Sequence, residues 1–402
     1  MQYQKKLLII GGGIVGIAIA REAALKKCFK EIILIEKEDH LGFHASSRNS
    51  GVIHAGFYYT PNTQKALFCS QANKLLRDYC LLNKVELKKT GKVVVCKNES
   101  ELDILNELYL RGVANKSKIY LFGSKELEDY ESLALTHKKF IWSPNTWSAN
   151  PKDLIKKMEV ELRELGVKII LNRRIVSYEN EIFIDNKNCN YKYDYVINAA
   201  GAYALQIAEI MGIKTNYTLL PFRGMYLKSN KKIKDFNTHI YPVPNINQPF
   251  LGIHTTLTAD HFIKLGPTAF PVLSPENYRL FEGIDLDFFP NILKNQLKLF
   301  INNSFGYRDL AFEEFKNLFK NNIVKSAQKL TSFKFDSRNF SWYTPGIRAQ
   351  IFDKSTGKLE MDFINIKKSN QYHILNSISP AWTCSLKTAE YVIEEVSDII
   401  KN

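Results

Sequence analysis

The sequence predicts an α/β protein in which a mostly parallel, nucleotide-binding domain is assembled from separate segments around an inserted, mostly antiparallel β domain. A buried strand, a glycine-rich turn and an alanine-rich helix open the chain at residues 7–27, and a second strand follows at 31–36. A further helix and strands lie at 151–198, and the chain ends with a strand and a helix at 372–401. The short strands between these pieces are punctuated by Pro and Tyr, which is typical of an antiparallel sheet. This order indicates one discontinuous domain and one insertion.

The length and composition fit a folded chain of two domains. The 402 residues exceed the roughly 100–200 residues of a usual single domain. Hydrophobic residues make up 45% of the chain and charged residues 24%, close to the averages for globular proteins. These values exclude a disordered, collagen-like or coiled-coil chain.

The net charge of +14 favours anionic partners. It arises from 55 basic and 41 acidic residues, and only 12 of the basic residues are Arg. We interpret most of the excess as a lysine-rich background. The basic residues are dispersed rather than arranged in a stripe with aromatic residues, so we expect no nucleic acid partner. Anionic lipid and an anionic substrate both remain open.

The cysteines and the N-terminus favour a soluble protein of a reducing compartment. The six Cys are scattered and form no CxxC pair, which argues against a zinc module and a disulfide framework. Lys5 and Lys6 precede an apolar stretch that mimics a secretory signal, but glycines interrupt it and it is shorter than a membrane span. We expect a cytoplasmic protein that can rest peripherally on the inner face of the membrane without crossing it.

The turn at residues 11–16 has the spacing and context of a dinucleotide-binding fingerprint. Gly11 permits the tight turn, Gly13 lets the backbone approach a pyrophosphate, and Gly16 lets the helix pack against the strand. The N-terminus of the helix offers N–H groups and partial positive charge to phosphates. Glu36 ends the next strand, where it can accept hydrogen bonds from a ribose, and we assign its neighbour Lys37 to the same site.

The second helix and strand unit is marked by helix start and stop signals. Asn150 can cap a helix, Pro151 occupies its first position, and Gly166 closes it. A strand at 167–171 follows, and another runs from 193 to 198. We expect further strands at 219–228, 239–243, 250–256, 260–265 and 372–375, a helical, aromatic segment at 275–335, and a last helix from about 384 to 401.

Three features favour FAD over NAD as the dinucleotide. Ala200 and Gly201 follow a strand, as in the second nucleotide-contacting segment of two-domain FAD enzymes. The Ser/Gly-rich loop at 46–56 comes soon after the ribose-binding strand, and the loop at 379–383 opens a helix whose N-terminus can stabilise negative charge on reduced flavin. The sequence contains no second glycine fingerprint for NAD(P)H, so we expect the substrate itself to reduce FAD.

These features define the expected domain boundaries. We assign residues 1–80, 145–212 and 340–402 to a discontinuous, Rossmann-like FAD-binding domain. Residues 81–144 and 213–339 then form the inserted, mostly antiparallel β substrate domain.

Five collinear blocks carry a family resemblance. They are Asn49-Ser50-Gly51-Val52-Ile53-His54-Ala55-Gly56-Phe57-Tyr58-Tyr59 with Lys65, Pro221-Phe222-Arg223-Gly224, Ile240-Tyr241-Pro242-Val243-Pro244, Pro249-Phe250-Leu251-Gly252-Ile253-His254 with Leu265-Gly266-Pro267, and Pro345-Gly346-Ile347-Arg348-Ala349-Gln350. With Ser379-Pro380-Ala381 and Thr383, they resemble the L-2-hydroxyglutarate oxidase/dehydrogenase family of the FAD-dependent, D-amino-acid-oxidase-like superfamily. The chain departs from the family pattern at Arg48, where we expect His, at Thr268, where we expect Asn, and over 270–335.

The resemblance implies FAD as the cofactor and a small 2-hydroxy acid as the substrate. Beyond the fingerprint, it and the loops above assign a larger set of residues to the cofactor. They are Ser47, Arg48, Asn49, Ser50, Gly51, Ala200, Gly201, Gly346, Arg348, Ser379, Pro380, Ala381, Trp382 and Thr383.

The chemistry needs a base for the hydroxyl proton while the flavin takes a hydride from C2. A histidine suits this role, and His54 is the first candidate because its loop is expected to lie against the flavin. His254 is the second candidate.

The substrate also needs groups that hold its carboxylates. Arg223 and Arg348 stand next to Pro and Gly in a chain that otherwise uses Lys, which indicates planar, bidentate recognition. Tyr59 and Tyr241 are candidates for hydrogen bonds to substrate oxygens, although packing in the core would also explain them.

Several functions remain as alternatives to oxidation of L-2-hydroxyglutarate to 2-oxoglutarate. A glycerol-3-phosphate dehydrogenase has a similar Asn-Ser-Gly-x-x-His-Ala-Gly loop, and an amine- or amino-acid-oxidising flavoenzyme comes next. A non-catalytic, nucleic-acid-binding flavoprotein is a remote alternative. We expect either a quinone or O2 to accept the electrons, and the residues indicate no metal site.

Overall fold

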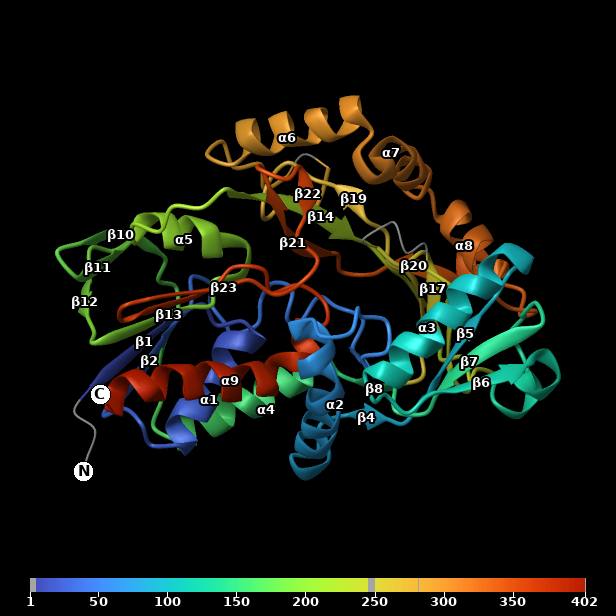
Figure 1. Cartoon of the computed structure of the whole chain (residues 1–402), viewed down its shortest axis with the longest axis horizontal. Helices are drawn as coiled ribbons and strands as arrows, with labels where there is room; N and C mark the ends of the chain where they lie inside the picture. Colours follow the sequence, from blue (N-terminus) through green and yellow to red (C-terminus); the bar gives the residue numbers. More distant parts are fainter. Residues whose placement is uncertain (1–4, 245–249, 281, 402) are drawn as a thin grey trace. The chain divides into compact units, whose positions relative to one another are not determined.

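The computed structural model describes residues 5–244, 250–280 and 282–401 (Figure 1). Its chain forms two compact units, each built from separated segments. The first consists of Met1–Ser47, Pro151–Pro221 and Arg348–Asn402, and the second of Arg48–Asn150 and Phe222–Ile347. The predicted α/β class, with a discontinuous nucleotide-binding domain, is confirmed.

The boundaries of the units differ from the expected domain boundaries near residue 48. The segment 48–80, which we assign to the FAD-binding part, lies in the second unit. Strand β3 (Val52–Ile53) pairs with β8 (Trp147–Ala149), and β8 also pairs with β4 (Leu87–Lys88). Helix α2 (Gln64–Leu82) contacts β3, so these local pairings place the segment in the second unit.

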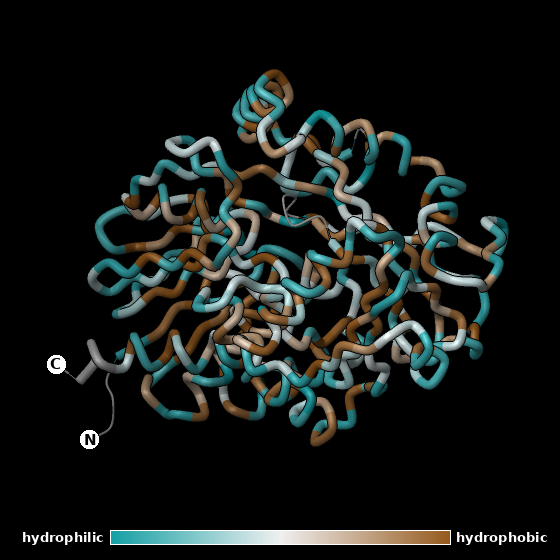
Figure 2. Tube along the Cα trace, turned by 45° about the vertical axis from the view of Figure 1, so that its right-hand side comes forward, coloured by the Kyte–Doolittle hydropathy of each residue, from teal (hydrophilic) through white to brown (hydrophobic). Residues whose placement is uncertain are grey.

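The first unit is built on a six-stranded sheet in the order β23-β24-β13-β1-β2-β9. Its strands are β1 (Lys6–Ile10), β2 (Glu31–Ile35), β9 (Lys168–Ile170), β13 (Tyr195–Asn198), β23 (Asn365–Lys368) and β24 (Gln371–Ile374). All neighbours are parallel except β23 and β24, which form a hairpin. Parallel strands are buried on both faces, which explains their unbroken apolar sequences. Figure 2 colours the Cα trace by hydropathy and shows hydrophobic (brown) and hydrophilic (teal) stretches alternating along the chain.

Helices contribute to the packing of this first unit. α1 (Ile14–Leu25) packs against α9 (Ala381–Lys401) and α4 (Pro151–Glu164). α4 begins at the predicted proline and ends just before Gly166, whose φ of +78° favours glycine. The unit also contains α5 (Ala204–Ile210) and an antiparallel sheet of β10 (Ile175–Glu179), β11 (Ile182–Asp185) and β12 (Asn190–Lys192).

The second unit is built on an eight-stranded sheet in the order β20-β15-β18-β17-β16-β5-β7-β6. Its strands are β5 (Lys92–Val95), β6 (Tyr120–Gly123), β7 (Lys139–Ser143), β15 (Leu227–Ser229), β16 (His239–Pro242), β17 (His254–Leu257), β18 (Ile263–Gly266) and β20 (Phe340–Trp342). The assigned pairs are antiparallel except β16 and β5, which run parallel. The expectation of a mostly antiparallel inserted sheet is confirmed.

Both faces of this sheet are covered. Val93 and Val95 belong to a core cluster that includes α8 (Lys320–Gln328), whereas Val94 belongs to a second cluster that includes α3 (Leu102–Ala114). Successive side chains of a strand point to opposite faces, so Lys92 lies on the same face as Val94.

The helices cover less of the segment 275–335 than expected. Helices α6 (Phe289–Asn302), α7 (Tyr307–Lys316) and α8 occupy it, while residues 275–288 form turns in the described part. The strand expected at 219–228 is interrupted between β14 (Tyr217–Gly224) and β15. The Met225 N–H donates to the Thr268 hydroxyl at 3.0 Å instead of to a neighbouring strand.

The remaining elements are short. Of the strand expected at 250–256, only the part from His254 is extended in β17, and Pro249 of the family block lies outside the described residues. A four-stranded sheet has the order β19-β14-β21-β22, with β19 at Phe270–Pro271, β21 at Gly346–Asp353 and β22 at Lys358–Leu359. The 3-10 helices are Glu99–Glu101, Ser124–Asp129, Gly201–Tyr203, Ser304–Gly306 and Ser337–Asn339. No helix in the described ranges combines the length and the apolar composition that crossing a membrane requires.

Candidate active site

The glycine-rich turn of the first unit has the geometry that a pyrophosphate needs. Gly11 has a φ of +112°, and a Cβ at Gly11 or Gly16 would lie closer than 3.0 Å to backbone atoms. At Gly13, by contrast, the backbone is in the ordinary extended region and a Cβ would meet only the Ser46 hydroxyl, at 3.2 Å. Gly11 and Gly16 are therefore required by the fold, whereas Gly13 leaves the backbone accessible to a ligand.

The first turn of α1 suits an anion. Gly13 is the N-cap residue and provides no side-chain cap, and the first turn contains no acidic residue. The Ile14 N–H donates to the Ser46 hydroxyl at 2.8 Å. The partial positive charge of the helix N-terminus is therefore not neutralised by a carboxylate of its own first turn.

Glu36 is buried at the end of β2 and its carboxylate is held by two backbone donors. The Gly12 N–H donates to Oε2 at 2.7 Å, and the Glu38 N–H donates to Oε1 at 2.9 Å. These bonds fix the carboxylate while each oxygen keeps lone-pair capacity for a ribose hydroxyl. Lys37 pairs with Glu38 and lies 5.1 Å from the centroid of the Tyr203 ring.

The other cofactor candidates of this unit lie at the ends of its strands and helices. Ala200 follows β13, and its N–H donates to the Asn198 side chain at 3.2 Å, with Gly201 opening a 3-10 turn. Ser379 and Pro380 lead into α9, whose first turn contains Ala381, Trp382 and Thr383. The Ala381 N–H donates to Ile378 O at 2.8 Å. The Trp382 indole nitrogen is buried and has no hydrogen-bond partner in the described part of the chain. The residues of this unit therefore fit a dinucleotide with further polar groups.

The predicted flavin loop continues in the second unit, after Ser47. Arg48 stacks over the Tyr278 ring at 4.2 Å, and its carbonyl faces Gly346, where a Cβ would come closer than 3.0 Å. Asn49 accepts the Gly51 N–H at 2.8 Å, which forms a tight side-chain turn. The loop is thus held by specific local contacts.

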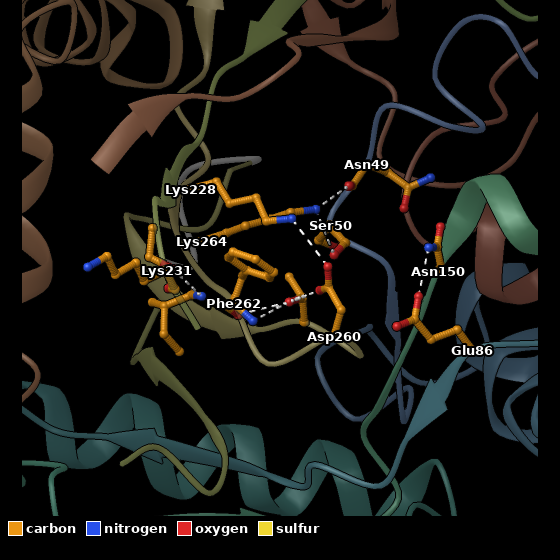
Figure 3. A network of polar contacts seen from close by, with 12 residues as sticks. Asn49, Ser50, Glu86, Asn150, Lys228, Lys231, Asp260, Phe262 and Lys264 are labelled. Atoms are coloured by element: carbon orange, nitrogen blue, oxygen red, sulfur yellow. Dashed lines mark hydrogen bonds and ion pairs between the residues drawn. The ribbon is translucent and has the colours of Figure 1, made fainter. Parts of the chain in front are cut away.

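Two neighbouring lysines lie to one side of this loop (Figure 3). Lys264 is buried on β18, and its ammonium lies 3.4 and 3.5 Å from the carbonyl oxygens of Asn49 and Ser50. Lys228, its register partner on β15, forms an ion pair with Asp260 at 3.3 Å. Sequence reasoning missed Lys264, because a single lysine does not indicate a site in a chain that contains so many lysines.

Of the two histidine candidates of the second unit, His54 is partly buried and His254 is buried, and they lie close enough for His254 to lower the pKa of His54. His54 follows β3, and its carbonyl accepts the Asn73 side-chain amide at 2.9 Å. His254 opens β17 and stacks on Tyr241 with ring centroids 3.7 Å apart. Its Nδ1 lies 2.8 Å from the Gly252 carbonyl, an acceptor, so Nδ1 carries the proton. In the neutral ring, Nε2 is then an acceptor.

The environment keeps His54 neutral. Burial, together with the smaller effects of the nearby Lys92 and His254, lowers its pKa to about 3. Burial also raises the pKa of Tyr241 far above its usual value, so its hydroxyl stays protonated. A neutral imidazole can accept a proton, which a base for the hydroxyl group must do. Lys92, which the sequence analysis did not single out, completes this cluster.

Arg223 is buried on β14 in an unusual state. Its guanidinium lies 5.2 Å from the Phe270 ring, its Nε has no hydrogen-bond partner, and it forms no ion pair with an acidic side chain among the described residues. Burial lowers its pKa. Thr268 donates to the Arg223 carbonyl at 3.2 Å, so the residue that departs from the family pattern ties down the strand of the arginine.

Two other substrate candidates are only partly buried. Arg348 is partly buried on β21 and belongs to the first unit, with the fingerprint glycines and Glu36. Tyr59 is partly buried in the second unit, and its carbonyl accepts the Asn115 amide at 2.8 Å. Their roles and those of the other site residues stay predictions.

Comparisons with known proteins bear on the family and the cofactor. A family model described as FAD dependent oxidoreductase matches residues 6–313. The mitochondrial L-2-hydroxyglutarate dehydrogenase of Caenorhabditis briggsae is 31% identical, over 97% of this chain and 92% of that protein. The human enzyme of the same name is 30% identical, over 97% and 88%. The Escherichia coli K12 L-2-hydroxyglutarate dehydrogenase is 27% identical, over 98% and 93%.

Solved structures agree on the fold. Dithionite-reduced L-alpha-glycerophosphate oxidase from Mycoplasma pneumoniae with FAD bound has a TM-score of 0.74 and 20% identity, over 98% of this chain and 94% of that chain. Glycine oxidase from Geobacillus kaustophilus has a TM-score of 0.72 and 15% identity, over 99% and 95%. Identities this low show the fold alone. With the full-length relatives above, they confirm the family expected from the sequence: the chain belongs to the FAD dependent oxidoreductases and, among them, to the L-2-hydroxyglutarate dehydrogenase family.

Proposed function

We propose that this protein oxidises L-2-hydroxyglutarate to 2-oxoglutarate, with FAD as the bound oxidant. The observation that carries the proposal is the similarity, over nearly the whole chain, to proteins named L-2-hydroxyglutarate dehydrogenase. The likeness to the glycerophosphate and glycine oxidases supports the fold and does not favour their substrates.

FAD, when bound, supplies the hydride acceptor for C2 of the substrate. In the first unit, Gly13 and the first turn of α1 would hold its pyrophosphate, and Glu36 would hold the ribose. The loops at Ala200 and Gly201 and at 379–383 would hold further parts of the cofactor, as predicted from the sequence.

The second unit would supply the proton acceptor. We assign the role to His54 first and to His254 second, because both belong to one cluster and His54 is held neutral by its surroundings. The imidazole would take the hydroxyl proton as C2 loses its hydride, which leaves the carbonyl of the 2-oxo acid. Proton and hydride together account for the two electrons and two hydrogens removed.

Arg223 would bind a carboxylate of the substrate. A buried guanidinium without an acidic partner is costly, and an anionic ligand would relieve that cost with two parallel hydrogen bonds. We propose the same role for Arg348, and hydrogen bonds to substrate oxygens for Tyr59 and Tyr241.

We further propose a quinone in the membrane as the electron acceptor, with O2 as the alternative. Two helices of the second unit expose apolar side chains that support peripheral contact. Leu297, Phe300 and Ile301 share one side of α6, Phe312 and Phe315 share one side of α7, and the rings of Phe300 and Phe312 lie 6.0 Å apart. The same helices expose Lys294, Lys298, Arg308 and Lys316. Apolar and basic residues together suit the surface of an anionic bilayer.

We place the protein in the cytoplasm, with the membrane contact peripheral. All six cysteines are free thiols, and five are buried. Free thiols agree with a reducing compartment.

Anaerobic mixing of the FAD-loaded protein with single substrates tests the proposed reaction. L-2-hydroxyglutarate should bleach the flavin absorbance, whereas D-2-hydroxyglutarate, glycerol-3-phosphate and amino acids should not. Bleaching by glycerol-3-phosphate or an amino acid alone would replace the proposal with one of the alternatives. Re-oxidation by a soluble quinone or by O2 in the same cell identifies the acceptor.

The two histidines can be separated by substitution. His54→Asn should lower the rate of flavin bleaching by roughly 10²–10⁴-fold, the usual contribution of a general base. His254→Asn serves as the parallel variant, and the larger loss identifies the base. Near-normal bleaching in both variants would remove both from the role.

A further inference from the structure

Lys92 occupies an unusual place in the second unit. It opens β5, a strand whose four residues are all buried, and its own side chain is 0% exposed. Its ammonium lies 4.7, 4.5 and 4.6 Å from the ring centroids of Phe57, Tyr58 and Tyr241. Three aromatic faces therefore surround the amine.

No described residue offers this amine a hydrogen bond or an ion pair. An ammonium that is taken out of water without an acceptor destabilises the fold, and cation–π contacts recover only part of the loss. The many other lysines of the chain keep it soluble, so solubility does not explain a buried lysine at this position. The position therefore calls for a functional explanation.

The surroundings of Lys92 point to the histidine cluster. Tyr241 contacts both Lys92 and the stacked ring of His254. Tyr58 follows His54 on the same loop, stacks on Phe57, and its hydroxyl has no hydrogen-bond partner among the described residues. On the other elements around the amine, the titratable groups are Cys69 on α2 and His239 on β16.

His239 is fixed in the neutral state by its hydrogen bonds. The Leu257 N–H donates to Nδ1 at 3.1 Å, so Nδ1 carries no proton. Nε2 lies 2.9 Å from the Thr90 hydroxyl and 3.4 Å from the Ser148 hydroxyl. After burial, the charge of Lys92 is also a cause of the lowered pKa of His239.

We propose that Lys92 is a positioning residue for the proton acceptor: its buried positive charge keeps His54 and His254 unprotonated, and its aromatic box holds the Tyr241 ring on which His254 stacks. The catalytic role of Lys92 rests on the proposed function, but its effect on the protonation of the two histidines does not depend on the substrate. It adds a residue that acts through the histidines, without contact to the reacting atoms.

The titration behaviour of the cluster supports this role. Burial lowers the pKa of Lys92 to about 7, so the amine is charged throughout the acidic range in which an imidazole would take up a proton. Lys92 follows burial as a cause of the lowered pKa of His54. At an effective dielectric constant near 20, a unit charge about 12 Å away moves a neighbouring pKa by about one unit, and a closer charge moves it by more.

Titration of the imidazole signals by NMR is the direct test. Lys92→Met and Lys92→Gln remove the charge, and Lys92→Arg keeps it. In the two neutral variants, His54 or His254 should titrate about one pH unit higher than in the native chain, whereas Lys92→Arg should leave both near their native values. His239, locked by its own hydrogen bonds, should not become protonated before the cluster does. His54→Asn and His254→Asn assign the signals.

Lys88 provides the matched control. It lies on β4 with its ammonium 2.8 and 2.9 Å from the two ring nitrogens of His261, and its charge contributes to the lowered pKa of that histidine. Lys88→Met should therefore raise the titration of His261 and leave His54 and His254 unchanged. A change at His54 of equal size in both lysine variants would point to a general charge effect and overturn the proposal.

The pH dependence of flavin reduction gives the catalytic readout. In Lys92→Met, the acidic limb of the rate should move up by about one pH unit, with the full rate regained at pH values well above the shifted limb. A loss that is uniform across pH, or histidine titrations identical to the native chain, would overturn the role of Lys92. If L-2-hydroxyglutarate fails to bleach native flavin, the proposed function fails, while the NMR arm still decides this inference.

The native chain alone provides a last arm, which matters if a neutral variant does not fold. The His54 or His254 signals should show an inflection as Lys92 loses its proton, and the inflection should vanish in Lys92→Arg, whose charge persists. Its absence from the native titration between pH 5 and 9 would contradict the proposed coupling.

Discussion

Two glycines of the same turn should fail in different ways when each is replaced by alanine. A Cβ at Gly16 would lie closer than 3.0 Å to the Gly11 carbonyl oxygen, which belongs to the backbone and cannot rotate away. Forced overpacking of this kind costs roughly 3 kcal/mol. At Gly13, φ is −75° and ψ is 170°, which alanine adopts freely, and the only close atom is the Ser46 hydroxyl at 3.2 Å.

Gly13→Ala should therefore fold, with a stability within about 1 kcal/mol of the native apoprotein. Its methyl group would stand where we expect the pyrophosphate to approach, so the Kd for FAD should rise at least tenfold, or about 1.4 kcal/mol. Gly16→Ala should lower the melting temperature of the apoprotein by roughly 6–12 °C, because about 1 kcal/mol corresponds to 2–4 °C in a unit of this size.

Thermal melts of the apoproteins by circular dichroism and FAD titrations by fluorescence quenching separate the two effects. Gly123→Ala is the matched control, because Gly123 has a φ of −79° and a ψ of 165°, and its Cβ would meet a carboxylate oxygen of Glu126 at 3.1 Å. That variant should change neither the melt nor the FAD affinity. Native FAD binding by Gly13→Ala, or a native melt of the Gly16→Ala apoprotein, would refute the assignment of the two glycines.

Three further substitutions test the charged groups. Glu36→Gln should weaken FAD binding about tenfold and slightly lower the apoprotein melt, because one amide oxygen replaces the two carboxylate oxygens that accept from Gly12 and Glu38; unchanged FAD titrations would contradict this. Arg223→Met should raise the KM for L-2-hydroxyglutarate at least tenfold without lowering the melting temperature of the apoprotein, since the guanidinium forms no ion pair with an acidic side chain in the described ranges. Steady-state kinetics measure the KM. An unchanged KM with a lower melting temperature would mean that the arginine is structural. Lys92→Met should be more stable than the native chain at pH 6, by up to roughly 5 kcal/mol, because folding lowers the pKa of Lys92 from 10.5 to about 7. The stability of the native chain should therefore rise between pH 7 and pH 10.5, and the advantage of the variant should shrink over the same range. Urea unfolding at each pH measures the difference. Equal unfolding free energies at pH 6 would argue against a buried charge.

The nucleotide-binding part of the fold was predictable because its signals are local. The apolar run before Gly11, the glycine spacing and the acidic end of the second strand each follow from constraints on a few consecutive residues. The start of α4 at Pro151 and its stop at Gly166 are equally local. Such constraints do not depend on the rest of the chain.

The second unit was less predictable because its order depends on long-range pairing. β5 lies between β16 and β7, so the one parallel pair joins residues 92–95 to residues 239–242. No local pattern encodes which strand becomes the neighbour of another. The interruption after β14 depends on a contact between Met225 and Thr268, which are also distant in sequence.

The candidate site shows the same division between local and distant signals. His54 and Arg223 stood out because their types are scarce in their surroundings. Lys92 and Lys264 did not stand out, because lysine is common throughout the chain. A useful local signal was present nevertheless, since Lys92 directly precedes three valines in a strand buried on both faces.

Buried position, more than net charge, distinguishes the basic groups with specific roles in this chain. Most of the positive charge is carried by surface lysines, whose hydrated ammonium groups interact weakly with any one partner. Arg223 and Lys92 are nearly or fully buried, and neither has an acidic partner among the described residues. Each should reduce stability in the free protein, so we expect each to be retained for its function. The function that we propose for Arg223 is to bind the anionic substrate, and for Lys92 to keep the candidate proton-accepting histidines unprotonated.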